Sequence, residues 1–362
     1  MAMNEFIIEK FRNYYKNADL DILKPEEREF GIGNKKKIDA RHLSFNSIDE
    51  FRLYLVSNTP LFTSHSTAYY RYPNETPIER KGWKGADLVF DLDLHADGKY
   101  EVYKKLENVK EDAIRLIEEF LIADFGINKK NILLVFSGNR GYHIHVREEE
   151  FLELRSDERK EIVDYVQGTG LDYRNFFTRE EIPGKKVEKL KGPKPNEDGY
   201  RGRFARAVIK KITNDPGSIS RIFKNEESQR EIFTKGIEGG NWSKTRVEKI
   251  IERLEIIAKD LPLKSVETDT GVTQDISKLI RVPNSIHGET GLIAKVVKEM
   301  DKFDPLRDSL IKSDEELKVR FNEDVPELEM GAETLSFKKD EIKEIKDSVA
   351  IFFILKGSAT II

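Results

Sequence analysis

Two segments in the first 150 residues carry apolar side chains at helical spacing. In 4–16 these positions include Phe6, Ile7 and Phe11, which predicts an opening amphipathic helix. The segment 113–123 has the same period and runs into an Asp-Phe-Gly turn, so a second helix is predicted to end there.

Strand-like patterns alternate with these helices. Residues 86–94 are apolar with polar side chains at alternate positions, and residues 131–136 are a short apolar run. A glycine-containing turn at 137–141 separates that run from a further strand at 142–146. The order of strand, helix and hairpin predicts an α/β (α+β) core around a mixed or antiparallel sheet.

The pattern changes from about residue 152. Helical periods at 158–166 and 243–259 flank a stretch rich in Gly, Pro and Lys at 183–202, which predicts a mobile loop between helices. The strand-like pattern returns at Val266. The predicted division is therefore a core of residues 1–155 and 263–362 with an inserted helical subdomain at 156–262, whose basic loop lies near 183–211.

The chain ends on an apolar run at 349–355, which predicts a fully buried strand. The strongly charged segment 311–347 before it is interpreted as surface. Neither this run nor any other apolar run reaches the roughly 18 residues of a membrane helix, so we expect a soluble, intracellular protein.

Composition narrows the possible chemistry. The 362 residues carry a formal net charge of −4, so any nucleic-acid contact depends on local positive charge. The chain has no cysteine, which excludes disulfides, thiol catalysis and thiolate zinc sites.

Asp91 and Asp93 stand at positions i and i+2 of a predicted strand, where side chains point to one face. Two adjacent carboxylates repel each other, and a dication that prefers oxygen ligands, such as magnesium or manganese, relieves that repulsion. An exposed acidic strand face is the alternative.

The segment FSGNRGYHIH at 136–145 combines two glycines with the donors Ser137, Arg140 and His143. Such a turn can bind phosphate through backbone amides and a guanidinium fork, although an ordinary hairpin is also compatible with it. His143 and His145 share a strand face and could bind zinc, but the lack of cysteine disfavours this interpretation.

A third cluster contains Asp269, Arg281 and His287 among turn residues. Each could be a plain turn former or a solvated charge. Taken with the first two clusters, they complete the inventory of a two-metal phosphoryl-transfer site: three carboxylates and several phosphate-binding groups.

Two further features indicate nucleic-acid contact. Arg71 stands between aromatic residues in YYRYP at 69–73, where it could stack on a nucleotide or simply belong to an edge strand. Residues 185–211 contain ten Lys/Arg and three Asp/Glu, a local net charge of +7 that could neutralise phosphates or be solvated surface.

Four of these segments resemble the small (catalytic) subunit of archaeal and eukaryotic DNA primases, the archaeal type most closely. They are YYRYP at 69–73, KGWKGADLVFDLD at 81–93, FSGNRGYHIHV at 136–146 and ETDTGVTQDISKLIRVPNSIHGETGL at 267–292. The resemblance spans nearly the whole chain and implies the family's catalytic core with an inserted helical subdomain.

The resemblance also implies roles for individual residues. Asp91, Asp93 and Asp269 correspond to the catalytic residues that hold two magnesium or manganese ions. The corresponding nucleotide-binding residues are Arg71, Ser137, Arg140, His143, Arg281 and His287. The implied partners are an iron–sulfur large subunit in a heterodimer, a single-stranded DNA template and NTPs or dNTPs, with no membrane.

Three departures from the family stand out. The chain has no cysteine for the zinc knuckle that many relatives carry, so no structural zinc is expected. Asn139 takes the place of the first of two arginines, and RHLSF at 41–45 is read as standing where relatives have Arg-Glu-Phe.

The expected function is template-directed, metal-dependent synthesis of short RNA or DNA primers for replication, in the cytoplasm of an archaeal cell. The alternative is a primase-like polymerase acting in DNA repair or on a mobile element. A catalytically inactive binding subunit would not need the acidic cluster, and a metal-dependent nuclease would not need the phosphate-binding turn.

Overall fold

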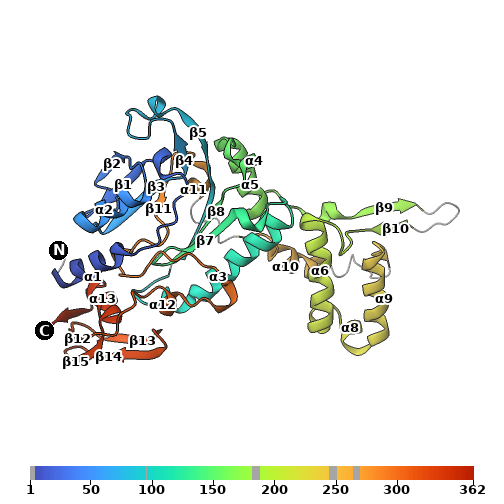
Figure 1. The fold of residues 1–362 in the computed structure, drawn as a ribbon. Coiled ribbons are helices and arrows are strands. Elements are labelled where there is room, and N and C mark those ends of the chain that lie inside the picture. The colour runs from blue at the N-terminus through green and yellow to red at the C-terminus, as the bar shows by residue number, and fades with distance from the viewer. Residues whose placement is uncertain (1–4, 95, 182–187, 244–250, 264–269) are drawn as a thin grey trace. The chain divides into compact units, whose positions relative to one another are not determined.

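The computed structural model describes residues 5–94, 96–181, 188–243, 251–263 and 270–362 (Figure 1). Its contacts divide the chain into two compact units. Unit 1 comprises Met1–Ile114, Asn128–Val163 and Ser265–Ile362, and unit 2 comprises Arg115–Ile127 and Asp164–Lys264. The predicted functional division, a catalytic core interrupted by a subdomain at 156–262, stays a prediction.

A three-stranded antiparallel sheet at the centre of unit 1 contains the predicted strands. Its strands are β6 (Leu88–Asp93), β8 (Gly141–Val146) and β7 (Ile132–Phe136), in that order. Their aliphatic and aromatic side chains are mostly buried, as the apolar runs predicted. The helix predicted at 113–123 is also present, but it begins earlier, as α3 (Leu106–Arg115), and its remainder is a π-helix at Leu116–Ile122.

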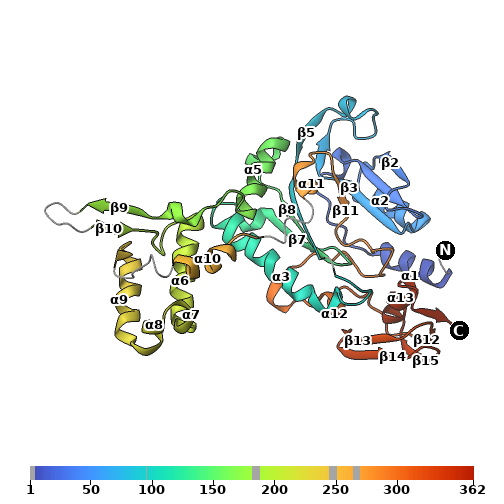
Figure 2. The same cartoon turned by 180° about the vertical axis from the view of Figure 1, so that it is seen from behind.

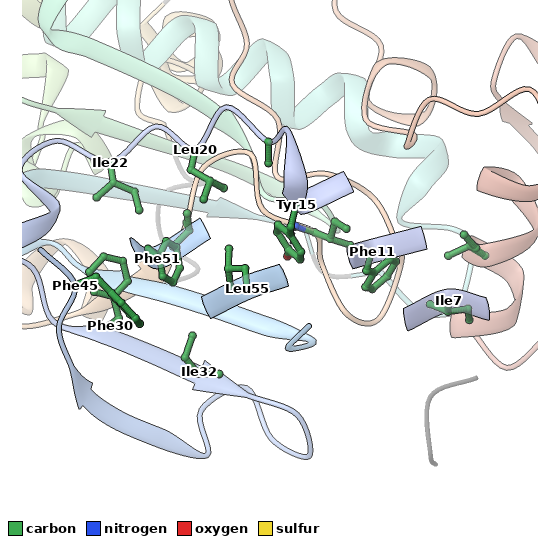
Figure 3. Close-up of a cluster of buried hydrophobic side chains, with 14 residues drawn as sticks. Ile7, Phe11, Tyr15, Leu20, Ile22, Phe30, Ile32, Phe45, Phe51 and Leu55 are labelled. Atoms are coloured by element: carbon green, nitrogen blue, oxygen red, sulfur yellow. Dashed lines mark hydrogen bonds between the residues drawn. The ribbon is translucent and has the colours of Figure 1, made fainter. Parts of the chain in front are cut away.

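A second antiparallel sheet has the order β11-β3-β1-β2. Its strands are β1 (Phe30–Gly33), β2 (Ala40–Leu43), β3 (Phe62–Ser66) and β11 (Leu279–Arg281). Figure 3 shows the apolar cluster that covers β1, to which α1 (Glu5–Lys16) and α2 (Ile48–Asn58) contribute Phe11, Tyr15, Phe51 and Leu55. This cluster confirms the predicted opening amphipathic helix.

The C-terminal part of unit 1 differs from the prediction. The run 349–355, predicted as a strand, is the helix α13 (Asp347–Leu355), followed by the short strand β16 (Ala359–Ile361). A short apolar run that is buried on every side has no period that separates strand from helix, and here the helix is formed.

The segment 311–347, interpreted only as charged surface, contains four strands. These are β12 (Glu316–Phe321), β13 (Val325–Met330), β14 (Glu333–Phe337) and β15 (Ile342–Lys346). They form the sheets β15-β12-β16 and β13-β14, with α12 (Pro305–Asp308) before them. Each strand exposes charged side chains, and these obscured the alternation of apolar positions by which a strand is predicted.

The remaining elements of the first unit connect these sheets. The strands β4 (Ala68–Tyr70) and β5 (Trp83–Ala86) pair with each other, α4 (Glu149–Leu152) and α11 (Thr270–Gln274) also belong to this unit, and α5 (Ser156–Gln167) begins in unit 1 and ends in unit 2. All strand pairs among the described residues are antiparallel, and together with the helices they confirm the predicted α/β (α+β) class.

Unit 2 is mainly helical. Its helices are α6 (Gly199–Asn214), α7 (Pro216–Ile219), α8 (Arg221–Asn225), α9 (Glu227–Glu238) and α10 (Ile251–Lys259). Figure 2 shows α6 beside α7 and α10, and β9 (Thr178–Glu181) paired with β10 (Glu188–Lys191). The predicted loop at 183–202 is therefore wrong in part, because 188–191 is a strand and α6 begins at Gly199.

No helix among the described residues is long and apolar enough to cross a membrane.

Candidate functional site

A cavity of about 320 Å³ lies in unit 1 between β6 and β8 on one side and β3 and β11 on the other. The two sheets meet next to it, where Val89 of β6 packs against Ile280 of β11 and Val272 of α11. Seven of the nine predicted site residues line this cavity: Asp91, Asp93, Ser137, Arg140, His143, Arg281 and His287. The fold therefore brings together side chains that are up to about 200 residues apart in sequence.

The two aspartates share one face of β6, as their i and i+2 positions require. Asp91 pairs across the strands with His143, whose Nε2 lies 3.6 Å from Asp91 Oδ1. Asp93 pairs with Gly141, and Arg140 Nη2 donates to Asp93 Oδ2 at 2.6 Å. Both carboxylate side chains remain partly exposed, at 20% and 26%. Both can therefore receive a ligand from the cavity.

The turn between β7 and β8 is held in place by its own serine. Ser137 Oγ accepts hydrogen bonds from the backbone N–H groups of Asn139, at 3.4 Å, and Gly141, at 3.2 Å. A hydroxyl that accepts two hydrogen bonds can still donate its own hydrogen. Ser137 thus shapes the turn and can also donate to an anion in the cavity.

The glycines of this turn are required by close approaches. Gly138 has φ +79°, and a Cβ there would lie 2.9 Å from His287 Cβ. The Gly138 carbonyl also accepts from Thr290 Oγ1 at 2.6 Å. At Gly141 a Cβ would lie 1.9 Å from the carbonyl oxygen of Leu92. The turn is therefore fitted against β6 and against the segment that carries His287.

Arg281 brings an unsatisfied positive charge to the cavity. It pairs with Ser64 in the register of β11 and β3, and its Nη1 is buried with no hydrogen-bond partner among the described residues. Burial lowers the pKa of Arg281 to about 10, still well above neutral pH. A buried donor of this kind costs free energy unless an acceptor reaches it, which favours an anionic ligand here.

Both cavity histidines are neutral at pH 7. Burial, and then the charge of Arg281, lower the pKa of His143 to about 3. The same two causes lower the pKa of His287 well below its ordinary value. His287 Nδ1 accepts from the N–H of Glu289 at 3.2 Å, so the ring hydrogen is on Nε2, where it can donate to an anion.

Two predicted residues are not placed at the cavity. Arg71 is exposed, its backbone N–H donates to the carbonyl of Gly82 at 3.0 Å, and it does not line the cavity. Asp269 lies outside the described residues. Lys37 and Lys278, which the sequence interpretation missed, line the cavity. Lys37 stands in no phosphate-binding motif, whereas Lys278 stands three residues before Arg281 within the segment 267–292 and was not singled out there.

The carboxylate pair fits a hard divalent cation, since its donors are oxygen atoms on one strand face. Among the described residues no group of three or more acidic or histidine side chains is placed to hold a metal, so the fit rests on Asp91, Asp93 and the undescribed Asp269. The rings of His143 and His145 stand 6.4 Å apart at 66°. The absence of structural zinc stays a prediction.

One interpretation of the sequence needs correction. The chain contains an Arg-Glu-Phe triplet at 28–30, before the segment 41–45 that was read in its place. Glu29 is buried and accepts from Lys81 Nζ at 3.0 Å and Arg41 Nε at 3.0 Å. Its role was missed because the triplet lies before the segment where it was sought.

Carboxylates beside phosphate-binding groups define a class of site, one for metal-dependent reactions of phosphate esters. The sequence profile of the DNA primase small subunit matches residues 90–299. The chain is 33% identical to the DNA primase small subunit PriS of Methanothrix thermoacetophila, covering 97% of both chains. It is 34% identical to that of Methanocella arvoryzae over 98% of this chain and 97% of the relative. It is 32% identical to that of Archaeoglobus fulgidus over 99% of both. The chain belongs to the DNA primase small-subunit family.

Proposed function

We propose that this chain is the catalytic subunit of a DNA primase. It would join nucleoside triphosphates into short RNA or DNA primers on a single-stranded DNA template, which makes it a nucleotidyltransferase. The observation that carries this proposal is the single cavity that contains both the carboxylate pair and the phosphate-binding turn. Membership of the family supports the same function.

In this proposal Asp91, Asp93 and Asp269 hold two magnesium or manganese ions. When bound, such ions lower the pKa of the attacking 3′-hydroxyl and offset charge on the leaving pyrophosphate. The helix that begins at Thr270, next to Asp269 in sequence, packs against β6 through Val272 and Val89. That packing supports the assignment of the third carboxylate.

The phosphate-binding residues act on the triphosphate. Ser137 and neutral His143 and His287 donate hydrogen bonds, while Arg140 and Arg281 supply positive charge. Because Arg281 Nη1 lacks a partner among the described atoms, it is already oriented without competition from another acceptor. Preorganised donors of this kind stabilise negative charge that grows in the transition state.

The partners follow from the same proposal. The name of the relatives, a small subunit, supports a heterodimer with a large subunit, which we propose carries an iron–sulfur cluster. Arg71 lies outside the cavity, and we propose that it contacts the nucleic acid rather than the triphosphate. The complex would work in the cytoplasm of an archaeal cell.

The test is synthesis without a primer. The protein is incubated with a single-stranded template, labelled NTPs or dNTPs, and magnesium or manganese. We expect short labelled products from the wild type and none from Asp93→Asn. Products that appear only when a gapped duplex supplies a primer would instead indicate a repair polymerase.

A further inference from the structure

The helix α13 ends beside the phosphate-binding turn. A Cβ on Gly291 would lie 2.6 Å from Ile351 Cγ2, so α13 packs directly against the segment that carries His287. The same segment contacts Gly138 of the turn. Lys356 is the C-cap residue of α13. A lysine therefore ends the helix that packs against the segment next to the turn.

Ring contacts connect Lys356 to the turn itself. Its Nζ lies 5.0 Å from the centroid of the Tyr103 ring and 6.0 Å from that of Phe352. The Tyr103 hydroxyl donates to Asn139 Oδ1 at 2.9 Å, and Asn139 directly precedes Arg140. The Lys356 ammonium group therefore lies near the rings of Tyr103 and Phe352, and the hydroxyl of Tyr103 binds the turn.

Positive charges outnumber negative charges around Lys356. No ion pair of Lys356 is found among the described residues, while the neighbouring Lys99 is paired with Glu323 at 2.5 Å. Burial is the main cause that lowers the pKa of Lys356 to about 8, and Lys99 and Arg140 lower it further, while Glu289 opposes the shift. Positive groups that converge on a partly buried position are costly without an anion.

We propose that Lys356 is a phosphate-binding residue of the nucleotide site, where its ammonium contacts the polyphosphate of the triphosphate beside Arg140. This inference rests on the proposed function. The cavity of about 320 Å³ is at the lower end of the roughly 300–1,000 Å³ typical of small-molecule sites. A nucleoside triphosphate would therefore extend beyond it. On the side of Arg140, Lys356 is a cation placed to meet the extending phosphates.

The first experiment measures dissociation constants for MgATP and for AMP. Lys356→Gln should weaken MgATP binding about tenfold, the loss of one hydrogen bond to a charged group, and leave AMP binding unchanged. Lys356→Arg should retain most of the affinity because it keeps the positive charge. The matched control is Lys99→Gln, which removes a neighbouring lysine that already has a carboxylate partner, and it should bind MgATP like the wild type.

The second experiment varies pH. Four groups act on the Lys356 ammonium: Lys99 and Arg140 repel it, Glu289 attracts it, and the Tyr103 ring packs against it. Since the lysine loses its proton above pH about 8, the wild type should lose MgATP affinity between pH 7 and 9.5. Lys356→Arg should keep its affinity over that range. This second experiment remains decisive if Lys356→Gln fails to fold.

The outcomes separate this inference from the proposed function. Equal MgATP affinity of the wild type and Lys356→Gln would overturn the inference. An equal loss of AMP binding would overturn it too, because it would show a structural role. A wild type that binds no MgATP, or an Arg140→Gln variant that binds it normally, would instead refute the nucleotide site.

Discussion

Two charged clusters of unit 1, around Asp87 and around Asp91, lie close in sequence. They differ in how completely their buried polar atoms are hydrogen-bonded. The Asp87 carboxylate has a partner at each oxygen: Arg28 Nη2 donates to Asp87 Oδ2 at 2.7 Å, and the Tyr69 hydroxyl donates to Asp87 Oδ1 at 2.8 Å. Arg28 also donates to the carbonyls of Leu23, Ser66 and Thr67. Neither charged group of this pair is exposed.

The cavity beside Asp91 is different. Arg281 Nη1 and Arg140 Nε are buried without hydrogen-bond partners among the described residues, and the two carboxylates keep partial exposure. Removing one partner of a buried ion pair is strongly destabilising, whereas a buried polar atom without a partner costs free energy until a ligand supplies one. The comparison therefore distinguishes structural charge from functional charge within one unit.

The largest effect is expected at the carboxylates. Asp91→Asn and Asp269→Asn should each reduce primer synthesis by at least about a thousandfold, because the cation sites are lost. The unfolding midpoint should stay constant or rise, since repulsion between carboxylates is relieved. Activity and thermal unfolding are measured on the same preparations.

His42→Ala is the matched comparison for those variants. His42 contacts Glu29 rather than the cavity, so only a small change in synthesis is expected. Near-normal synthesis by Asp269→Asn would contradict the three-carboxylate mechanism.

Substitutions in the cluster around Asp87 should change the free energy of unfolding rather than activity. Asp87→Asn leaves the Arg28 charge buried without its partner, which should lower the free energy of unfolding by about 3–5 kcal/mol. The folded protein should bind MgATP with unchanged affinity. Chemical denaturation and a binding titration test the two statements. Asp308→Asn, at a more exposed pair with Arg307, should cost less than about 1 kcal/mol.

Gly138→Ala tests the connection between the turn and the His287 segment. The φ of +79° alone should cost about 1–3 kcal/mol of stability, and the contact 2.9 Å from His287 Cβ should displace that segment. MgATP affinity should therefore fall. Gly126→Ala is the control, because Gly126 has φ +69° and nothing within 4 Å of an added Cβ. If both variants lose MgATP affinity equally, the proposed connection is wrong.

A pair of buried histidines connects the two clusters and predicts acid sensitivity. His65 Nδ1 lies 2.9 Å from the carbonyl oxygen of Ser66, and the His65 and His145 rings stack at 6.2 Å. Burial lowers the pKa of both residues well below the ordinary value, so the unfolded state binds protons that the folded state does not.

Stability should therefore be complete above pH about 6.5 and fall below it, by about 1.4 kcal/mol per pH unit for each such histidine. His145→Phe should reduce that slope by one proton. Urea denaturation between pH 7.5 and 5.5 measures it, and an unchanged slope would refute protonation of His145 as a cause.

The smallest effect is expected in unit 2, where several cations of the basic segment are already paired. Lys191 pairs with Glu180, Arg203 with Asp124 and Lys211 with Asp215. Lys185 and Lys186 lie outside the described residues. No ion pair is found for Lys189, Lys194, Arg206 or Lys210 in the described part of the chain, and we take Lys189 and Lys194 as the two candidates for template contact.

Reversing both charges, Lys189→Glu with Lys194→Glu, should weaken single-strand binding. It should also flatten the dependence of log K on log salt by about 0.7 for each lost phosphate contact. The control reverses the exposed Lys338 and Lys343 of unit 1. An unaltered salt slope would show that the basic segment is solvated surface.

Local sequence patterns were sufficient for the β6 and β8 side of the cavity, whereas β3 and β11 on its other side were not predicted as strands. The strands β6, β7 and β8 and the opening helix each have a clear hydrophobic period, and the Asp91–Asp93 spacing fixes a shared strand face. The patterns failed for α13, whose buried surroundings remove any period, and for β12 to β15, whose charged side chains dominate the pattern. The sequence pattern distinguishes a helix from a strand where one face of the element is exposed to water and the other is buried.

The contacts that complete the cavity could not be predicted in this way. Lys37 stands in a segment with no phosphate-binding motif, whereas Lys278 stands within 267–292, three residues before Arg281, and both line the cavity. Lys356 is not among the lining residues and is connected to the turn only through Tyr103. Glu29 and Lys81 are similarly joined across 52 residues of chain. Such pairs depend on how the sheets and helices pack together. A short segment of sequence carries no information about that packing.

The packing of α13 against the turn has a consequence for protein synthesis. Arg140 leaves the ribosome more than 200 residues before Lys356, which corresponds to roughly 10–40 s at typical rates of translation. His287 and Thr290 follow Arg140 by about 150 residues, and the C-terminal helix that packs against their segment is completed last. On the proposed nucleotide site, a growing chain carries Asp91 and Asp93 for many seconds before the groups proposed to bind the triphosphate are complete, and ribosome-bound fragments should be catalytically silent.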